Sequence, residues 1–154
     1  MRPTADLGFN AALLVALGEL RKADRLEAEI EHTLAGRGYD PDTVAGVVER
    51  LKSWRFLDDR RTVDDRVSHG RQRKLGRARI AVELVEKGAP QEEVAERLSE
   101  ISDESEIELA VELLAKKPRA KPPQAARFLA YRGFDEETIE AVLARVYPDM
   151  ETMG

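Results

Sequence analysis

The chain reads Leu34-Ala35-Gly36-Arg37-Gly38-Tyr39-Asp40-Pro41, and the pattern of this stretch returns twice. Gly88 and Gly133 take the place of Gly38 in the later copies, at spacings typical of helical repeats. A leucine stands four residues before each glycine, and a basic residue directly precedes it. Apolar residues follow each glycine at steps of four and three, which trace one face of an α-helix. We expect the three leucines to be buried at equivalent positions: Leu34, Leu84 and Leu129.

Each glycine is predicted to end one helix and to start a tight turn into the next. The turn needs a positive φ, which glycine adopts readily, and the preceding basic residue suits the negative end of a helix. Asp40-Pro41 then fits an N-cap followed by the first helical residue, and Asp135 fits a second N-cap. The middle copy differs because Pro90 stands where the others have Asp. Each copy is therefore predicted to hold two antiparallel helices.

A further helix is predicted before each pair, over residues 10–22, 59–71 and 103–116. Residues 117–123 contain three prolines and are excluded from a helix interior. No stretch has a β-type alternation of useful length. We predict an all-α fold, a tandem repeat of three three-helix units with about nine helices, elongated and curved. The predicted units span residues 1–57, 58–102 and 103–148, with a C-terminal tail over 149–154.

Composition excludes several classes of protein. The 154 residues are 42% hydrophobic and 36% charged, which excludes a disordered chain. No apolar run approaches the ~20 residues of a membrane span, and Met1-Arg2-Pro3-Thr4 lacks a signal-peptide layout. The absence of cysteine excludes disulfides, a thiol nucleophile and cysteine-based zinc sites. We expect a cytoplasmic protein.

No residue pattern indicates an enzyme. Asp58-Asp59 and Asp64-Asp65 are adjacent pairs whose side chains would not face each other on a helix, so helix capping is the simpler interpretation. His32 and His69 lack the spacing of metal ligands, and Gly36-Arg37-Gly38 lacks the rest of a phosphate-binding loop. We predict no catalytic residue, no metal site and no cofactor.

Charge is distributed unevenly along the chain. The net charge is −5, yet residues 60–88 hold 9 basic and 4 acidic residues, and residues 89–115 hold 1 basic and 9 acidic residues. Ordinary solvated helix faces are one interpretation of this pattern. The other is a surface for a polyelectrolyte in the middle of the molecule, with an acidic surface for a protein partner elsewhere.

The most basic stretch runs from residue 71 to residue 79 and contains no acid. We predict that its five cations contact an anionic partner, and that a break at Leu75-Gly76 lets both sides converge on it. The alternative is a charged turn neutralised by Glu83 and Glu86. The candidate binding residues are Arg71, Arg73, Lys74, Arg77 and Arg79.

Two aromatic residues stand just before this region, Trp54 and Phe56. They are interpreted either as side chains that pin the junction between two units or as exposed stacking groups.

Several distributed motifs resemble the RecX family, which regulates the recombinase RecA. The resemblance covers residues 16–146, and its distributed matches are together more specific than any single motif; one of them is Phe56-Leu57-Asp58-Asp59 with Arg61. Leu26 stands where the family commonly has Ser, and Thr62 replaces a usual aromatic residue. The remaining matching stretches are Ala16-Leu17, Leu20-Arg21-Lys22, Arg25, Glu29-Ile30, Arg37-Gly38-Tyr39-Asp40, Val48, Leu51, Lys74-Leu75-Gly76, Ile80, Glu83-Leu84, Lys87-Gly88 and Arg132-Gly133-Phe134.

The resemblance implies tandem three-helix units and a non-enzymatic regulator. Its implied partner is the RecA filament on single-stranded DNA, bound in the helical groove, with inhibition of strand exchange, ATP hydrolysis and coprotease activity. Weak direct DNA contact, no membrane association and a monomeric chain complete the expectation. The alternative is a helical-repeat module that binds nucleic acid without RecA.

Overall fold

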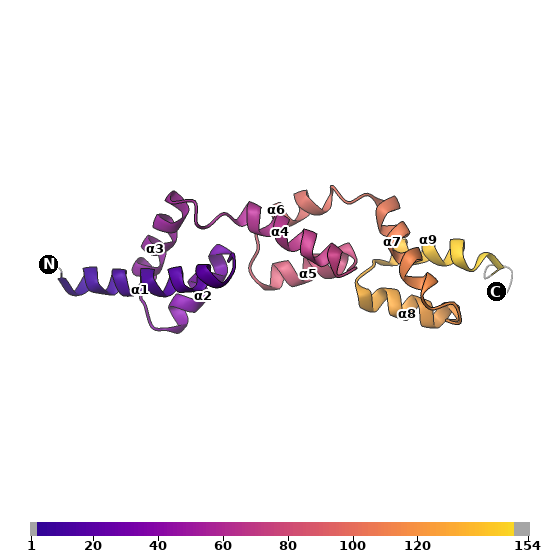
Figure 1. Ribbon diagram of the computed structural model, residues 1–154, viewed down its shortest axis with the longest axis horizontal. Coiled ribbons are helices and arrows are strands. Elements are labelled where there is room, and N and C mark those ends of the chain that lie inside the picture. The colour runs from indigo at the N-terminus through magenta and orange to yellow at the C-terminus, as the bar shows by residue number, and fades with distance from the viewer. Residues whose placement is uncertain (1–2, 150–154) are drawn as a thin grey trace. The chain divides into compact units, whose positions relative to one another are not determined.

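The computed structural model describes residues 3–149, and this part of the chain is all-α, as predicted. Figure 1 shows the succession of helices, joined by turns and loops. The predicted tail lies outside the described residues apart from Asp149, as do Met1 and Arg2 of the opening stretch. Within residues 3–149 the helices are α1 (Pro3–Lys22), α2 (Glu27–Gly36), α3 (Pro41–Ser53), α4 (Asp59–Gln72), α5 (Arg77–Glu86), α6 (Gln91–Leu98), α7 (Asp103–Ala115), α8 (Pro122–Arg132) and α9 (Glu136–Val146).

The chain forms two compact units. Unit 1 contains the described residues up to 65 together with residues 84–93, and unit 2 contains residues 66–83 together with the described residues from 94 on. The helices α4, α5 and α6 each contribute to both units. The predicted division into three triplets rests on sequence equivalence and stays a prediction.

In unit 1, α3 packs against both α1 and α2 (Figure 1). The three helices meet because each carries apolar residues at helical spacing. Leu34 is fully buried in this core, as predicted. The other buried members are Ala12, Ala16, Ile30, Val44, Val47, Val48, Leu51 and Leu57.

In unit 2, α9 packs against α7 and α8. Leu129 is fully buried in this core, again as predicted. The guanidinium of Arg145 on α9 donates two hydrogen bonds to the Glu104 carboxylate on α7, both 3.0 Å long. This hydrogen-bonding lowers the pKa of Glu104.

The predicted turn chemistry is confirmed at each glycine. Gly38, Gly88 and Gly133 have φ values of 91°, 93° and 99°, in the left-handed region that favours glycine. Asp40 and Asp135 are N-caps whose carboxylates accept from the backbone N–H three residues on, at 2.8 and 2.9 Å. Local sequence therefore determines where these helices begin and end.

No helix among residues 3–149 is long and apolar enough to cross a membrane.

Candidate functional site

The basic segment, residues 71–79, surrounds the break between α4 and α5. Lys74 has a φ of 62°, and the Leu75 N–H donates to the Gly70 carbonyl at 3.0 Å, which ends α4. After Gly76 the chain starts α5 at Arg77. The break predicted at Leu75-Gly76 is thus present.

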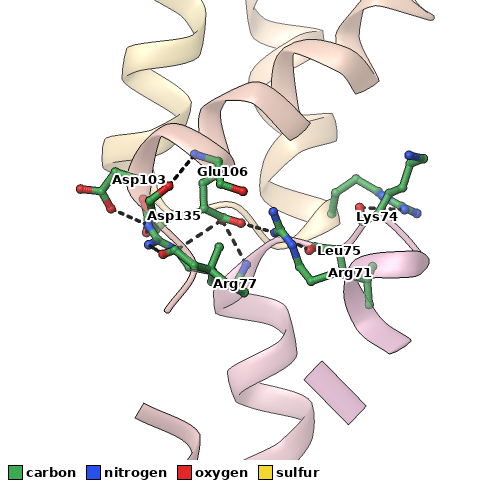
Figure 2. Close-up of polar contacts among 11 residues, drawn as sticks. Arg71, Lys74, Leu75, Arg77, Asp103, Glu106 and Asp135 are labelled. Atoms are coloured by element: carbon green, nitrogen blue, oxygen red, sulfur yellow. Dashed lines mark hydrogen bonds and ion pairs between the residues drawn. The ribbon is translucent and has the colours of Figure 1, made fainter. Parts of the chain in front are cut away.

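Both sides of this break converge on one carboxylate, and that carboxylate is internal. Glu106 on α7 is fully buried, and its Oε1 atom accepts a hydrogen bond from Arg71 Nη1. Its Oε2 atom accepts from the Arg77 backbone N–H at 3.1 Å and lies 3.6 Å from Arg77 Nε. Figure 2 shows the two arginines on either side of Glu106. A buried carboxylate is tolerated here because two cations and a helix N-terminus compensate its lost hydration.

The Arg77 side chain is held by further partners. Its guanidinium donates to the Ile101 carbonyl at 2.8 Å and to the Asp103 carboxylate at 3.0 Å, and it lies 3.8 Å from Asp135. These bonds join the start of α5 to the starts of α7 and α9 within unit 2 (Figure 2). Arg77 is therefore a residue of the fold's polar interior.

Two more cations of the segment have partners at the surface. Lys74 Nζ lies 3.0 Å from Glu112 Oε1, and this bond lowers the pKa of the Glu112 carboxyl. Arg79 Nε lies 3.1 Å from Glu83 Oε2, as the alternative of a neutralised turn expects. Both pairs are solvent-accessible and contribute little to stability.

Four of the five cations of the basic segment therefore have an acidic partner within the chain: Arg71, Lys74, Arg77 and Arg79. Arg73 is exposed, and its guanidinium has no ion-pair partner among the side chains that the structure describes. Most of the compensating acids come from residues 89–115, the acidic stretch that follows in sequence. In this part of the chain the basic and acidic stretches therefore pair with each other, because α7 packs beside the α4–α5 break and brings its acids to the cations.

The turn after α8 docks on the same break through backbone atoms. The Arg132 guanidinium donates to the Arg73 carbonyl and, at 3.0 Å, to the Lys74 carbonyl. The Gly76 N–H donates to the Arg132 carbonyl at 2.9 Å, and the Gly133 carbonyl accepts from the first turn of α5. A Cβ on Gly76 would overlap the Gly133 carbonyl, and a Cβ on Gly133 would overlap Arg79. Sequence reasoning missed this contact, although Gly76 beside a predicted break was a signal for it.

Unit 1 holds a counterpart at the start of α2. The N-cap residue Leu26 has no side-chain acceptor, and Asp59 Oδ1 from α4 instead accepts from the Glu27 backbone N–H at 2.8 Å. A Cβ on Gly88 would overlap Ala28 in the first turn of α2. The N-termini of α2 and α5 are thus each capped by a carboxylate and contacted by a glycine turn from later in the chain.

The carboxylate pair of unit 1 is electrostatically unfavourable. Burial raises the pKa of Asp59, and burial together with the Asp59 charge raises the pKa of Glu27. Lys52 Nζ, 3.6 Å from Glu27 Oε1, offsets part of this effect. The pair has a structural role, because Asp59 caps α2, whose N-cap residue Leu26 has no side-chain acceptor.

The remaining acids and the two histidines considered in the sequence analysis do not form a metal-binding group among the described residues. Asp58 caps its own helix by accepting from the Arg61 N–H at 3.2 Å, as predicted, whereas Asp64 and Asp65 lie inside α4 and not at a helix start. His32 and His69 are exposed. Among residues 3–149, no three His, Asp or Glu side chains are grouped so as to hold a metal ion.

Trp54 and Phe56 are half-exposed, at 43% and 48%, and their ring centroids lie 5.7 Å apart with an edge-to-face angle of 61°. Arg50 lies over the Trp54 ring, 5.7 Å from its centroid. This exposure favours the interpretation of the two residues as stacking groups.

No protein-family model matches the chain. Several curated proteins do match the chain in sequence. The chain is 34% identical over 134 residues to the regulatory protein RecX of Leptothrix cholodnii, covering 83% of this chain and 84% of the relative. It is 32% identical to the RecX of Chromohalobacter salexigens, covering 86% and 90%. With the RecX of Clostridium perfringens the identity is 27%, and the chain spans 66% of that relative's length.

Solved structures agree on the fold. The crystal structure of RecX from Lactobacillus salivarius superposes with a TM-score of 0.78 at 18% identity, covering 92% of this chain and 97% of that one. A second RecX crystal structure gives a TM-score of 0.75 at 20% identity. The relatives are named regulatory proteins, not enzymes. On the identity to its relatives over most of both chains, this chain belongs to the RecX family of regulatory proteins.

Proposed function

We propose that the chain binds the RecA–DNA filament and inhibits its recombinase, ATPase and coprotease activities in DNA repair and the SOS response. The observation that carries this proposal is the 34% identity to a RecX protein over 84% of that relative's length. Repeated helical units support it physically, because several linked weak contacts along a polymer give high avidity.

The basic segment is the proposed contact with the filament, and Arg73 is its most available member. The side chains of Arg71 and Arg77 bind the buried Glu106. If they turned outward to contact the filament, the Glu106 carboxylate would stay buried without a compensating cation, which is costly. Arg73 is exposed and lies beside Lys74, whose pair with Glu112 is accessible to solvent. A contact with phosphate or carboxylate is therefore expected to centre on Arg73.

Three binding measurements test the function: to single-stranded DNA alone, to RecA alone, and to the filament stabilised by an ATP analogue. We expect the filament to bind best. Strong binding to naked DNA with no preference for the filament would instead favour the alternative, a nucleic-acid-binding module that acts without RecA.

Charge reversal tests the contact surface. Arg73→Glu should weaken filament binding and relieve inhibition while leaving the unfolding temperature unchanged, since the side chain has no ion-pair partner to lose within the described part of the chain. Arg119→Glu is the matched control, because Arg119 is an exposed residue of the α7–α8 loop in the same unit. If Arg73→Glu inhibits RecA as well as the parent chain does, the contact lies elsewhere.

A further inference from the structure

The end of α3 forms an exposed corner in unit 1 that the internal ion pairs leave unexplained. Its members are Arg50, Trp54, Arg55 and Phe56, which we call the aromatic corner. Trp54 and Phe56 contact each other edge to face and remain half-exposed. Two adjacent exposed aromatic rings are unusual in a chain with one Trp and four Phe, because burying them would stabilise the fold.

The backbone at this corner carries a cost. The Phe56 N–H donates to the Leu51 carbonyl at 2.8 Å and the Arg55 N–H to the Lys52 carbonyl at 2.9 Å, which places Arg55 at the left-handed position of a helix C-terminus. Its φ is 63°, a conformation that disfavours a side chain. The chain uses glycine for left-handed turns at Gly38, Gly88 and Gly133, whereas Arg55, like Lys74 in the basic segment, keeps a side chain there against a structural preference.

The side chain retained there is a free cation. Arg55 is exposed and has no ion-pair partner in the part of the chain that the structure describes. Residues 50–56 contain three basic residues and no acid, in a chain whose net charge is −5. Aromatic faces interleaved with cations complement a partner that carries flat bases and phosphates together.

We propose that the aromatic corner binds single-stranded nucleic acid, with bases stacked on Trp54 and Phe56 and phosphates paired with Arg50 and Arg55. A single strand fits better than a duplex because its bases expose their faces. In a filament this site would contact the bound DNA strand, and this contact rests on the proposed function. Binding of a free single strand does not depend on the proposed function.

Trp54 is the chain's only tryptophan, so intrinsic fluorescence reports on the proposed site directly. We expect an oligothymidylate about 20 nucleotides long to quench this fluorescence, with an affinity that falls steeply as salt rises. Phe56→Leu should weaken binding on the order of tenfold, measured by the same quenching. Trp54→Leu should do the same when binding is followed by the anisotropy of a labelled oligothymidylate.

Arg55→Gly separates binding from stability because its two effects have opposite signs. Glycine relieves the left-handed strain, so the unfolding temperature should rise, by about 2–4 °C, while oligothymidylate affinity should fall severalfold. Tyr131→Leu is the matched control. Tyr131 is 75% exposed with Arg79 5.5 Å from its ring centroid, but it lies outside the corner, and its loss should leave affinity unchanged.

Absence of quenching at saturating oligothymidylate would overturn the proposal, as would unchanged affinity in both aromatic variants. Variants that keep oligothymidylate affinity but lose filament binding would assign the corner to a protein surface, which also overturns it. A parent chain that binds oligothymidylate through the corner but fails to prefer the filament would contradict the proposed function and leave this inference intact.

Discussion

The start of α2 in unit 1 and the start of α5 in unit 2 are both capped by a carboxylate, but the charges around the two carboxylates differ. Each first residue, Glu27 or Arg77, donates its backbone N–H to a carboxylate from a later helix. In unit 2 that carboxylate is the buried Glu106 between two arginines. In unit 1 it is Asp59, which lies close to the acid Glu27 and has a raised pKa. The same kind of backbone cap is therefore surrounded by compensating cations in unit 2 and by a second acid in unit 1.

The helix that ends at the third glycine turn, α8, starts differently. α8 begins with Pro122 and Pro123, which have no N–H to be capped. The need for a carboxylate disappears because the donors themselves are absent.

The largest expected effect comes from removing the carboxylate of unit 2. Glu106→Ala should lower the free energy of unfolding by about 3–5 kcal/mol, because Arg71, Arg77 and a backbone N–H lose their shared acceptor. Chemical denaturation measures this. The matched control is Glu112→Ala, which breaks an exposed pair with Lys74 and should cost less than about 1 kcal/mol. Equal costs for the two variants would refute the distinction between the buried and exposed pairs.

The next largest loss of stability is expected at Gly133, which has a φ similar to that of Gly38 but is closely packed, whereas Gly38 is not. Gly133→Ala should cost about 3 kcal/mol, since it adds an overlap with Arg79 to the left-handed strain. Gly38→Ala should cost only about 1–2 kcal/mol, because a Cβ there meets open space. Thermal unfolding of both variants compares them. If Gly38→Ala is as damaging as Gly133→Ala, the close docking of the two turns does not matter.

A smaller effect concerns pH in unit 1. A carboxyl whose pKa is raised in the folded state binds protons more tightly there, so its ionisation at neutral pH costs stability, and that cost is relieved as pH falls through the raised pKa. The parent chain should therefore gain stability relative to Asp59→Asn as the pH is lowered from about 7 to about 4. Urea unfolding across this range measures the difference. Asp42→Asn, at an exposed acid in the first turn of α3, is the control. A parallel pH profile for the parent and Asp59→Asn would contradict the unfavourable pair.

The smallest effect lies three residues further along α4. Thr62 is buried, and its Oγ1 atom has no hydrogen-bond partner among the described residues. Thr62→Val conserves volume and removes that unsatisfied hydroxyl, so it should raise the free energy of unfolding by about 1 kcal/mol. Thr62→Ser keeps the hydroxyl and should bring no gain. A destabilised valine variant would show that the hydroxyl is satisfied in solution.

Helix positions were predictable because their causes are local. Apolar spacing after each glycine, the N-caps Asp40 and Asp135, and the two prolines that begin α8 act within a few residues of the chain. The basic segment was harder to interpret, because its partners Glu106 and Glu112 belong to a different helix. In sequence, Glu106 is one acid among nine in residues 89–115, and nothing local marks it as the buried one.

The sequence by itself determined the all-helical fold class, the three left-handed glycine turns and the burial of Leu34, Leu84 and Leu129, since φ preference and apolar periodicity are properties of neighbouring residues. Only the tertiary structure decided that Arg71 and Arg77 face inward, that Gly76 and Gly133 must lack a Cβ, and that Trp54 and Phe56 stay exposed. Those outcomes depend on which helices pack together. Packing brings a carboxylate or a carbonyl from dozens of residues away to within hydrogen-bonding distance, and no short stretch of sequence encodes that distance.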